Sequence, residues 1–517
     1  MRNARDEVPG PWPSECCTRA RVVARTVRAL APDAHRALVA QNAGLAPSPA
    51  RDAHLAALAA GAAAVVTGQQ VGLFLGPLYT LYKAASAIVV ARTLAAETGA
   101  PVVPVFWLQT EDHDLAEIAT CGVPVAGGCE MVGVPIDAAS RISIEHCVLP
   151  VEVDGCVDQL AEVLGEGPLA RTHVERLRRH YRAGVSWAAA FAGLLAELFA
   201  PEGLVMIDPR DPALAALTAP IHARAIEAAA PIAEALGARC RELEATGARV
   251  PVHVRPGAPL SFFHPGGASG PRVRLEPAGD GFAEVGSGRV HARAALLAAL
   301  REDPRQFSTS ALLRPIVQDE LLPTVAYVGG PSEVAYFAQL APVYRAFERI
   351  PPFAVPRARF RVTDPRTRKL LARLGWTVGD AEQPEAALLA RSRPPGPDAA
   401  EIAARLLAPF AAAHAQLAVE LAAAGPVVAR ALAKTRGSVE RSVGKLAART
   451  ERVQLYADAE RVAAVRRLRG MLAPDGAPQE RVLGLPGLAA RVGDRVLIDR
   501  VLAAIDPFDA SLQELAA

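Results

Sequence analysis

Four consecutive polar residues, Glu111 to Asp114, form the most chemically suggestive cluster in this sequence. They read Glu-Asp-His-Asp and follow an apolar run, residues 101–108, that is typical of a buried strand. In an open α/β sheet, ligands bind outside the carboxyl ends of the strands, where such a cluster would lie. Its carboxylates could bind Mg²⁺, or His113 could act as a general base held by a carboxylate. The alternative is that Asp112 or Asp114 only caps the next helix.

A glycine-rich segment lies upstream, between a predicted strand at residues 62–66 and a predicted helix at 78–96. A loop of this kind exposes backbone N–H groups near the positive end of a helix, which suits phosphate or carboxylate. Its candidate binding residues are Thr67, Gly68, Gln69, Gln70, Gly72, Gly76, Tyr79 and Lys83. The alternative is a turn that merely lets the helix pack on a sheet. The spacing matches neither a Walker A loop nor the dinucleotide-binding motif.

The same device recurs near residue 330. A predicted strand, 324–328, runs into two glycines and a proline-led helix, and a predicted helix around Pro315 precedes it. Polar or glycine residues of this second cluster are Arg314, Gln318, Asp319, Tyr327, Gly329, Gly330 and Glu333. Glu333 could bind substrate, or it could only complement the dipole of its own helix.

These clusters need a sheet to position them. Strand, helix and strand over residues 62–108 make a βαβ unit, which predicts an α/β fold with a parallel sheet. Residues 203–208 and 353–356 add strand candidates, and 212–245 is predicted to be helical. Short β runs among Gly and Pro turns over 250–292 predict an antiparallel insertion.

The pattern changes beyond a Pro-rich linker at residues 391–398. Two helices, about 402–421 and 426–471, are joined by Gly425-Pro426, and the second carries apolar residues at intervals of seven. This pattern predicts an antiparallel coiled-coil hairpin. Residues 426–470 hold eleven Lys or Arg and four acids, a difference of +7. That charge suits an acidic partner or simply a solvated face.

Bulk composition narrows the class of protein. The chain has 517 residues, too many for one core, and its net charge of +2 does not single out nucleic acid as a partner. Seven cysteines without a Cys-x-x-Cys pair argue against a disulfide framework or a zinc site. No haem or flavin is expected either. No long uncharged apolar run or signal sequence is visible, so we expect a cytoplasmic protein without a membrane span.

Several of these segments resemble the bacillithiol biosynthesis cysteine-adding enzyme family, BshC. The run from Thr67 to Thr80, with Lys83 behind it, carries the most specific part of the resemblance. Further matching segments are Pro104–Trp107 with Glu111–Asp114, Leu313–Asp319, Leu322–Pro331 and Pro478–Arg481. Together they span about residues 60 to 510.

The resemblance implies a Rossmann-like core of the nucleotidyltransferase kind, with insertions at about 121–200 and 250–300. On this basis we expect the core over 1–390, the hairpin over 391–473 and a helical segment packing back on the core over 474–517. The coiled coil would pair two subunits as a homodimer. The implied reaction joins the cysteine carboxylate to the amine of glucosaminyl-malate through an activated carboxylate. We expect ATP or ADP as the nucleotide, with Mg²⁺ as a further candidate cofactor.

The resemblance also implies roles for residues. Catalytic roles would fall to Lys83, Glu111, His113 and Asp114, and Mg²⁺ would lie among Glu111, Asp112 and Asp114. The charges of these substrates require an acidic and a basic group, and our own hypothesis is that Asp112 takes the ammonium of cysteine and Arg314 the malate carboxylates. The glycine loop would hold nucleotide phosphates, although no histidine lies between His54 and His113, so the paired histidines of nucleotidyltransferases are missing.

Two other functions fit the sequence less well. One is another adenylate-forming amide ligase with a different amine acceptor. The other is a basic coiled-coil scaffold or nucleic-acid-binding protein, for which polar clusters at strand ends would have no use.

Overall fold

The computed structural model describes residues 30–125, 127–137, 141–392 and 396–517. The chain divides into two compact units. The first comprises the described residues of 1–123, 130–364 and 479–517. The second comprises those of 124–129 and 365–478. The main segment of the second unit thus runs from residue 365 to 478, whereas the sequence predicted a hairpin domain over 391–473 and a C-terminal segment from 474.

A five-stranded parallel sheet forms the centre of the first unit. Its order is β12 (Phe353–Pro356), β11 (Thr324–Gly329), β1 (Ala63–Gln69), β2 (Val102–Leu108) and β5 (Val205–Ile207). Every neighbouring pair is parallel. The α/β fold with a parallel sheet is therefore confirmed.

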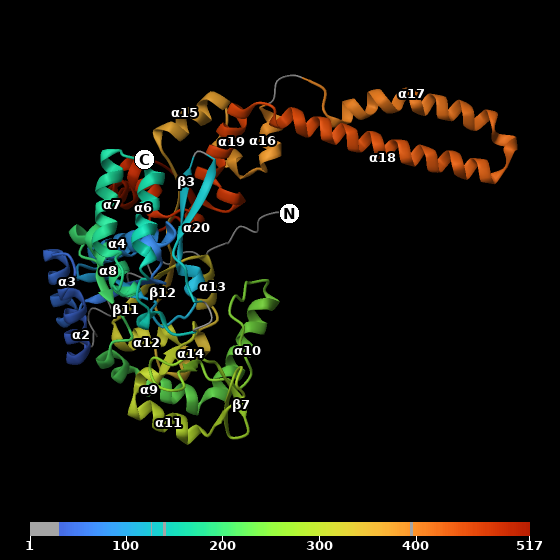
Figure 1. The fold of residues 1–517 in the computed structure, drawn as a ribbon. Coiled ribbons are helices and arrows are strands. Elements are labelled where there is room, and N and C mark those ends of the chain that lie inside the picture. Colours follow the sequence, from blue (N-terminus) through green and yellow to red (C-terminus); the bar gives the residue numbers. More distant parts are fainter. Residues whose placement is uncertain (1–29, 126, 138–140, 393–395) are drawn as a thin grey trace. The chain divides into compact units, whose positions relative to one another are not determined.

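The sheet is buried on both faces because helices cover each side (Figure 1). Alternate residues of a strand point to opposite faces. Ala64 and Val66 thus join one apolar core, whereas Ala63 and Val65 join the other. The second core is closed by α4 (Tyr79–Thr98). Helices that contribute to the first core include α2 (Pro32–Ala43), α3 (Pro49–Ala59), α9 (Pro212–Glu227), α10 (Ala229–Ala245), α12 (Arg314–Leu321) and α14 (Ala341–Ala346).

The strand order places a topological switch point between β1 and β11. From β1 the chain continues to β2 on one side, and it returns much later to β11 on the other side. A crevice forms outside the carboxyl ends of two such strands because their connections leave in opposite directions. The polar residues after β1, β2 and β11 all lie at this edge. The short helix α13 (Pro331–Phe337) follows β11 directly.

Two excursions leave the sheet. The first contains β3 (Thr120–Val125), β4 (Gly128–Gly133), α6 (Glu152–Leu164), α7 (Pro168–His180) and α8 (Trp187–Leu198).

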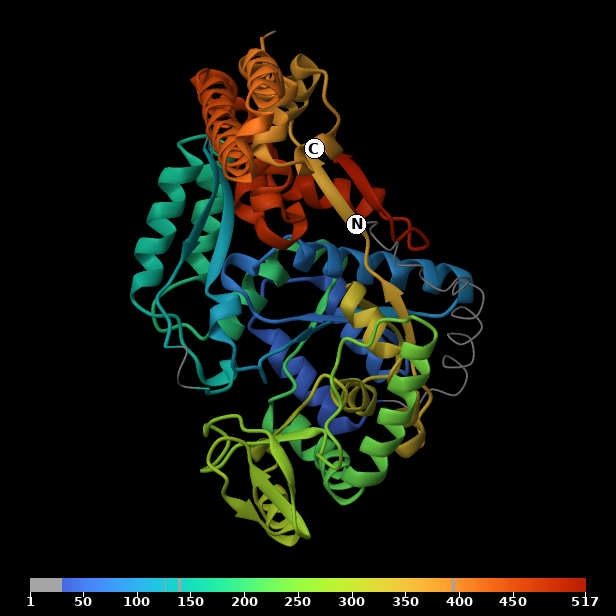
Figure 2. The same cartoon turned by 90° about the vertical axis from the view of Figure 1, so that its right-hand side faces the viewer.

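In the second excursion, β6 (Ser261–Phe263) pairs with β10 (Phe307–Thr309) in antiparallel fashion. The strands β7 (Leu275–Ala278), β8 (Gly281–Glu284) and β9 (Val290–His291) form an antiparallel sheet followed by α11 (Arg293–Glu302). Figure 2 shows this region in yellow-green, and the predicted antiparallel insertion is confirmed.

The second unit is helical. It contains α15 (Pro365–Leu374), α16 (Glu385–Arg391), α17 (Ala399–Glu420), α18 (Pro426–Tyr456) and α19 (Ala459–Leu472). Figure 1 shows α17 and α18 as an antiparallel hairpin, as predicted. The prediction of one helix from 426 to 471 is wrong: Asp458 interrupts it, since its side chain accepts from the N–H of Arg461 and caps α19.

Helix α17 also bears on the membrane expectation. By length and composition it is the one described helix that could cross a membrane, and none of its residues is buried. This is weak support for a membrane span, because an apolar helix that packs in a hairpin meets the same criterion. His414 of α17 indeed contacts α18 through the carbonyl oxygen of Leu432 at 3.0 Å.

The end of the chain belongs to the first unit. It consists of α20 (Gln479–Val482), α21 (Leu485–Val492), α22 (Asp494–Ala504) and β14 (Leu512–Ala516), which pairs in parallel with β13 (Arg359–Thr363). A buried bidentate ion pair secures it: Arg357 donates to both oxygens of Glu480, at 2.8 and 2.9 Å.

Candidate functional site

A cavity of about 1050 Å³ opens at the switch point, outside the carboxyl ends of β1, β2 and β11. Its far wall comes from residues 251–275 of the second excursion and from the segment 309–314. Nine of the residues predicted from the sequence line it: Gly68, Gln69, Gln70, Asp112, His113, Asp114, Arg314, Tyr327 and Glu333. The three sequence clusters therefore meet in one place.

Asp112 is the central carboxylate of this cavity. Its Oδ2 accepts from Gln70 Nε2 at 2.8 Å, and its Oδ1 accepts from the N–H of His113 at 2.8 Å. A guanidinium nitrogen of Arg272 lies 3.4 Å from Oδ1. Burial alone would raise the pKa of Asp112, but the bonds from His113 and the charge of Arg272 hold it well below its usual range. Asp112 is therefore an anion at neutral pH.

His113 lies beside it. Its Nδ1 is 3.4 Å from Asp112 Oδ1 and 3.3 Å from Arg272. Nδ1 accepts from Arg272 in one tautomer and donates toward Asp112 in the other. In the second tautomer Nε2 is left as a base, which is the arrangement that a His–carboxylate pair offers for proton transfer.

The other two acids of the cluster have different partners. Glu111 is buried behind the cavity wall, where it accepts hydrogen bonds from the N–H and the hydroxyl of Thr309. Burial raises the pKa of Glu111, and nearby Arg210 offsets this only in part. Asp114 accepts from the N–H of Glu117 and caps the short helix α5 (Leu115–Ile118), which matches the capping alternative.

The expected magnesium ligands thus do not converge. Glu111 turns to Thr309, Asp112 to Gln70 and His113, and Asp114 to its own helix. Within the described ranges, no group of three or more His, Cys, Asp or Glu residues is placed to hold a metal ion. Residues of the chain therefore do not fit a resident metal at this cluster.

The glycine loop is closed on itself. The N–H groups of Gly72, Leu75, Gly76 and Leu78 donate to carbonyl oxygens of Gln70, Gly72, Leu73 and Leu483 respectively. Consequently these four donors are not free to bind phosphate, and Gly72 and Gly76 do not line the cavity. Thr67, also predicted as a binding residue, donates instead to the carbonyl oxygen of Val328 and ties β1 to β11.

Lys83 and Glu333 form an ion pair at the cavity wall, where Glu333 lines the cavity and Lys83 does not. Lys83 Nζ lies 2.5 Å from Glu333 Oε2, and the lysine side chain is 4% exposed. Glu333 also accepts from the hydroxyl of Tyr327 at 2.6 Å and from the N–H of Gly330 at 2.8 Å. Burial lowers the pKa of Lys83, and Glu333 acts against that shift. Gly329 and Gly330 hold this pair and do not themselves line the cavity.

Arg314 lines the cavity, but two of its guanidinium nitrogens donate to other side chains of the protein. One nitrogen donates to Gln318 at 2.8 Å and another to Tyr336 at 3.1 Å, and the guanidinium lies over the ring of Tyr327. Gln318 is fully buried. Asp319 accepts from the hydroxyl of Tyr344 at 2.8 Å, on the side of α12 away from the cavity lining. Tyr79 also lies outside the lining, 3.4 Å from Gln69 Nε2.

The residues predicted from the sequence did not include the basic side chains of the far cavity wall. Arg272 is buried, stacks on the ring of Phe262 at 3.7 Å and donates to Ser308 and to the carbonyl oxygen of Thr309. Other basic residues of the lining are Arg141, His253, Arg255, Arg274. The density of Arg and His over 253–274 was the available signal, but this segment is an insertion whose position no sequence rule supplies.

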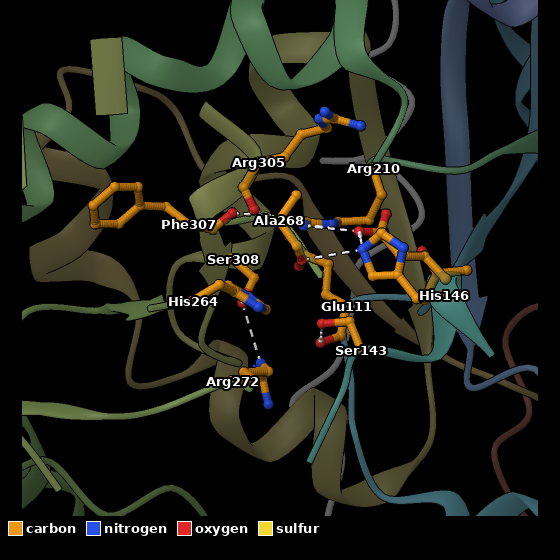
Figure 3. Close-up of polar contacts among 12 residues, drawn as sticks. Glu111, Ser143, His146, Arg210, His264, Ala268, Arg272, Arg305, Phe307 and Ser308 are labelled. Carbon is orange, nitrogen blue, oxygen red and sulfur yellow. Dashed lines mark hydrogen bonds and ion pairs between the residues drawn. The ribbon is translucent and has the colours of Figure 1, made fainter. Parts of the chain in front are cut away.

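A buried polar cluster fixes this wall to the sheet edge (Figure 3). Arg210, just after β5, donates to the carbonyl oxygens of Arg305 and Phe307 and to Glu145. Ser308 bonds to both His264 and Arg272. Burial lowers the pKa of His264 to about 3, so its imidazole is neutral. These hydrogen bonds hold the far wall against the polar cluster Glu111–Asp114.

Comparison with known proteins fits this architecture. Residues 20–358 match the model of the N-terminal Rossmann-like domain of BshC, and 361–515 match that of its C-terminal coiled-coil domain. This chain belongs to the BshC family. A relative from Koribacter versatilis is 36% identical over 475 residues, which cover 88% of this chain and 85% of that protein. One from Solibacter usitatus is 35% identical, over 84% and 80% of the two chains. Both carry the name "Putative cysteine ligase BshC".

The whole cavity lies within the BshC Rossmann-like domain, since its lining runs from Gly68 to Tyr336. The BshC coiled-coil domain begins close to the point where the second unit starts. The family resemblance read from the glycine loop and the strand ends is therefore confirmed over most of the chain.

Proposed function

We propose that this protein is a cysteine ligase of bacillithiol synthesis, which joins the carboxyl group of cysteine to the amine of glucosaminyl-malate. Support comes from its family and from the names of its relatives. The observation that carries the proposal is the pairing, in one cavity, of the anionic Asp112 and its neighbour His113 with a wall of arginines. An amide ligase needs both a base and a means to bind an anionic substrate.

The charges of the cavity divide the substrates between its two ends. An ammonium group suits Asp112, which is an anion and whose contact with the guanidinium of Arg272 is long, at 3.4 Å. A dicarboxylate such as malate suits the basic wall, where Arg141 and Arg274 are exposed and Arg272 is buried beside them. This assignment replaces Arg314 for the malate, because two guanidinium nitrogens of Arg314 already serve Gln318 and Tyr336.

The chemical step is the attack of the amine nitrogen on an activated cysteine carboxyl carbon. A C–N bond forms, the bond to the phosphate or adenylate leaving group breaks, and the leaving group departs with its electron pair. The amine nitrogen must lose one proton, and His113 Nε2 accepts it with Asp112 stabilising the resulting imidazolium. The activating cosubstrate in this proposal is ATP or ADP. Mg²⁺ would enter with the phosphates of the nucleotide, since the chain's own carboxylates do not converge.

The proposal extends to the state of the protein in the cell. We place it in the cytoplasm, as a homodimer through the hairpin of α17 and α18. Apolar side chains of the hairpin are exposed in the single chain, among them Leu446 and Val453. A second copy would cover such side chains, because heptad-spaced apolar residues pair helices.

Mass spectrometry of the product tests the function. Purified protein receives cysteine and glucosaminyl-malate, with and without ATP and Mg²⁺, and a matched substrate set replaces glucosaminyl-malate by other amines. We expect bacillithiol with an equal amount of AMP or ADP. Amide formation with another amine in preference to glucosaminyl-malate would reassign the acceptor, and the absence of any amide, even with cell extract added, would overturn the ligase.

Variants then test the base. Loss of a general base typically costs 10²–10⁴-fold in rate. We expect about that loss for His113→Gln and a loss of at least tenfold for Asp112→Asn. Asp280→Asn is the matched control, because Asp280 is exposed in the turn between β7 and β8. A His113→Gln variant with full activity would contradict the assigned base.

A further inference from the structure

The buried ammonium of Lys83 has no donor left for a substrate. An ammonium group carries three N–H bonds. Lys83 Nζ lies 2.8 Å from the carbonyl oxygen of Gly68, 2.9 Å from Gln69 Oε1 and 2.5 Å from Glu333 Oε2. These three oxygens account for all three bonds, and Lys83 does not line the cavity. Its influence on a bound substrate must pass through one of its partners.

Of these partners, Gln69 is the one whose orientation Lys83 decides. An amide side chain can place either its oxygen or its NH₂ group toward a neighbour. An NH₂ group facing an ammonium would set donor against donor, so the oxygen of Gln69 must face Lys83. The Nε2 of Gln69 then points away from the lysine, and Gln69 lines the cavity.

Among the described residues, the NH₂ group of Gln69 has only long contacts. Its Nε2 is 3.4 Å from the hydroxyl of Tyr79 and 3.5 Å from Gln70 Oε1. Good N–H···O hydrogen bonds measure 2.7–3.2 Å. A donor that is held in place but weakly engaged can bind an oxygen of a ligand with little cost in reorganisation.

The next residue links this donor to an acceptor. Gln70 Nε2 donates to Asp112 Oδ2 at 2.8 Å. One glutamine side chain thus separates the Gln69 donor from the anionic Asp112. An α-amino acid has a matching pair of groups, since its carboxylate accepts hydrogen bonds and its ammonium donates them.

We propose that Gln69 and Asp112 form the subsite for the amino-acid substrate, in which Gln69 Nε2 donates to the substrate carboxyl oxygen and Asp112 accepts from its ammonium. Lys83 is a positioning residue that polarises the Gln69 amide and fixes its direction. The identification of this amino acid as cysteine rests on the proposed function. During amide formation, the same donor faces the oxygen on which negative charge develops.

Three ligands and three variants test this subsite by isothermal titration calorimetry under reducing conditions, with ATP and glucosaminyl-malate left out so that no product forms. Cysteine has both groups, 3-mercaptopropionate lacks the ammonium, and cysteamine lacks the carboxylate. Gln69→Met removes the donor without adding charge. Gln69→Glu removes the donor but keeps an oxygen for Lys83. Gln416→Met is the matched control, because Gln416 is exposed on α17 and does not line the cavity.

The expected result is a loss of about tenfold or more in cysteine and 3-mercaptopropionate affinity for both Gln69 variants, as a hydrogen bond to a charged group implies. Cysteamine affinity should change less than threefold, and Gln416→Met should bind all ligands nearly as the parent does. Adding Lys83→Met to Gln69→Met should weaken cysteine binding little further, because a positioning residue acts only through its partner.

The inference is overturned by any of three results: unchanged cysteine affinity in Gln69→Met, an equal loss for cysteamine, or an equal loss in Gln416→Met. Failure of the parent protein to bind cysteine at all overturns it as well. Failure to form bacillithiol while Gln69-dependent cysteine binding persists would instead count against the proposed function and leave the subsite intact.

Discussion

Removal of the Lys83 ammonium should destabilise the sheet edge by a predictable amount. Lys83→Met leaves the carboxylate of Glu333 without its cation, and breaking a buried ion pair from one side typically costs about 3–5 kcal/mol. Glu333 keeps hydrogen bonds from Tyr327 and Gly330, and its side chain is 24% exposed, so water can replace part of the loss. We therefore expect a loss of about 2–3 kcal/mol in the free energy of unfolding.

The complementary change isolates the interaction. Glu333→Gln keeps an oxygen for Lys83 but removes the charge that stabilises the buried ammonium, and we expect a similar loss of about 2–3 kcal/mol. Lys83→Met with Glu333→Gln leaves no unpaired charge. The double variant should therefore lose only about 2 kcal/mol in all, well short of the sum of the single losses.

Urea unfolding followed by tryptophan fluorescence measures these differences. Trp107 and Trp187 belong to the first unit, and Trp107 lies against Gly68, next to the ion pair. Replacing Trp12 and Trp376 by Phe leaves these two as the reporters. If the losses of the two single variants add to within about 0.5 kcal/mol in the double variant, the residues do not interact and the reasoning is refuted.

Three further outcomes follow from other parts of the molecule. Tyr181→Phe should cost about 1–2 kcal/mol in urea unfolding, because the Tyr181 hydroxyl bonds to Gly72 and Leu75 in a loop where Leu75 has φ +74°; an unchanged midpoint would contradict this. The neutral His264, with its pKa lowered to about 3 from 6.5, contributes stability that is complete above pH 6.5 and is lost as pH falls toward 3. Between pH 7 and 5 the free energy of unfolding of the parent protein should therefore fall by about 2 kcal/mol more than that of His264→Gln. Equal pH slopes for the two proteins would contradict this. Leu446→Glu with Val453→Glu should give a monomer by light scattering, and a parent protein that is itself monomeric would refute the homodimer.

Several elements were predictable because local sequence determines them. Apolar runs bounded by turn residues marked β1, β2, β5, β11 and β12, and the interval of seven marked the hairpin of α17 and α18. The break at Asp458 was missed because helical periodicity continues across it, and only the cap with Arg461 ends the helix. The split of the 212–245 region at Ala228 was missed for the same reason.

The candidate site was predictable in part. Rules for parallel sheets place residues after β1, β2 and β11 at one edge, so Gln69, Asp112 and Glu333 could be brought together from sequence patterns alone. Those rules do not say which atoms of each residue remain open. Lys83 illustrates this limit, since its place behind the glycine loop suggested a binding or catalytic residue, whereas its three N–H bonds end on the chain's own oxygens.

The sequence by itself determined the α/β core, the hairpin, the family and the strand ends where chemistry can occur. These properties depend on periodicity, turn residues and motifs, which are local along the chain. Only the tertiary structure decided that Arg272 completes the cavity, that Glu111 turns away to Thr309, and that the glycine loop satisfies its own N–H groups. Each of these depends on segments more than a hundred residues apart, such as Asp112 and Arg272, or on which hydrogen-bond partners remain after the chain has folded.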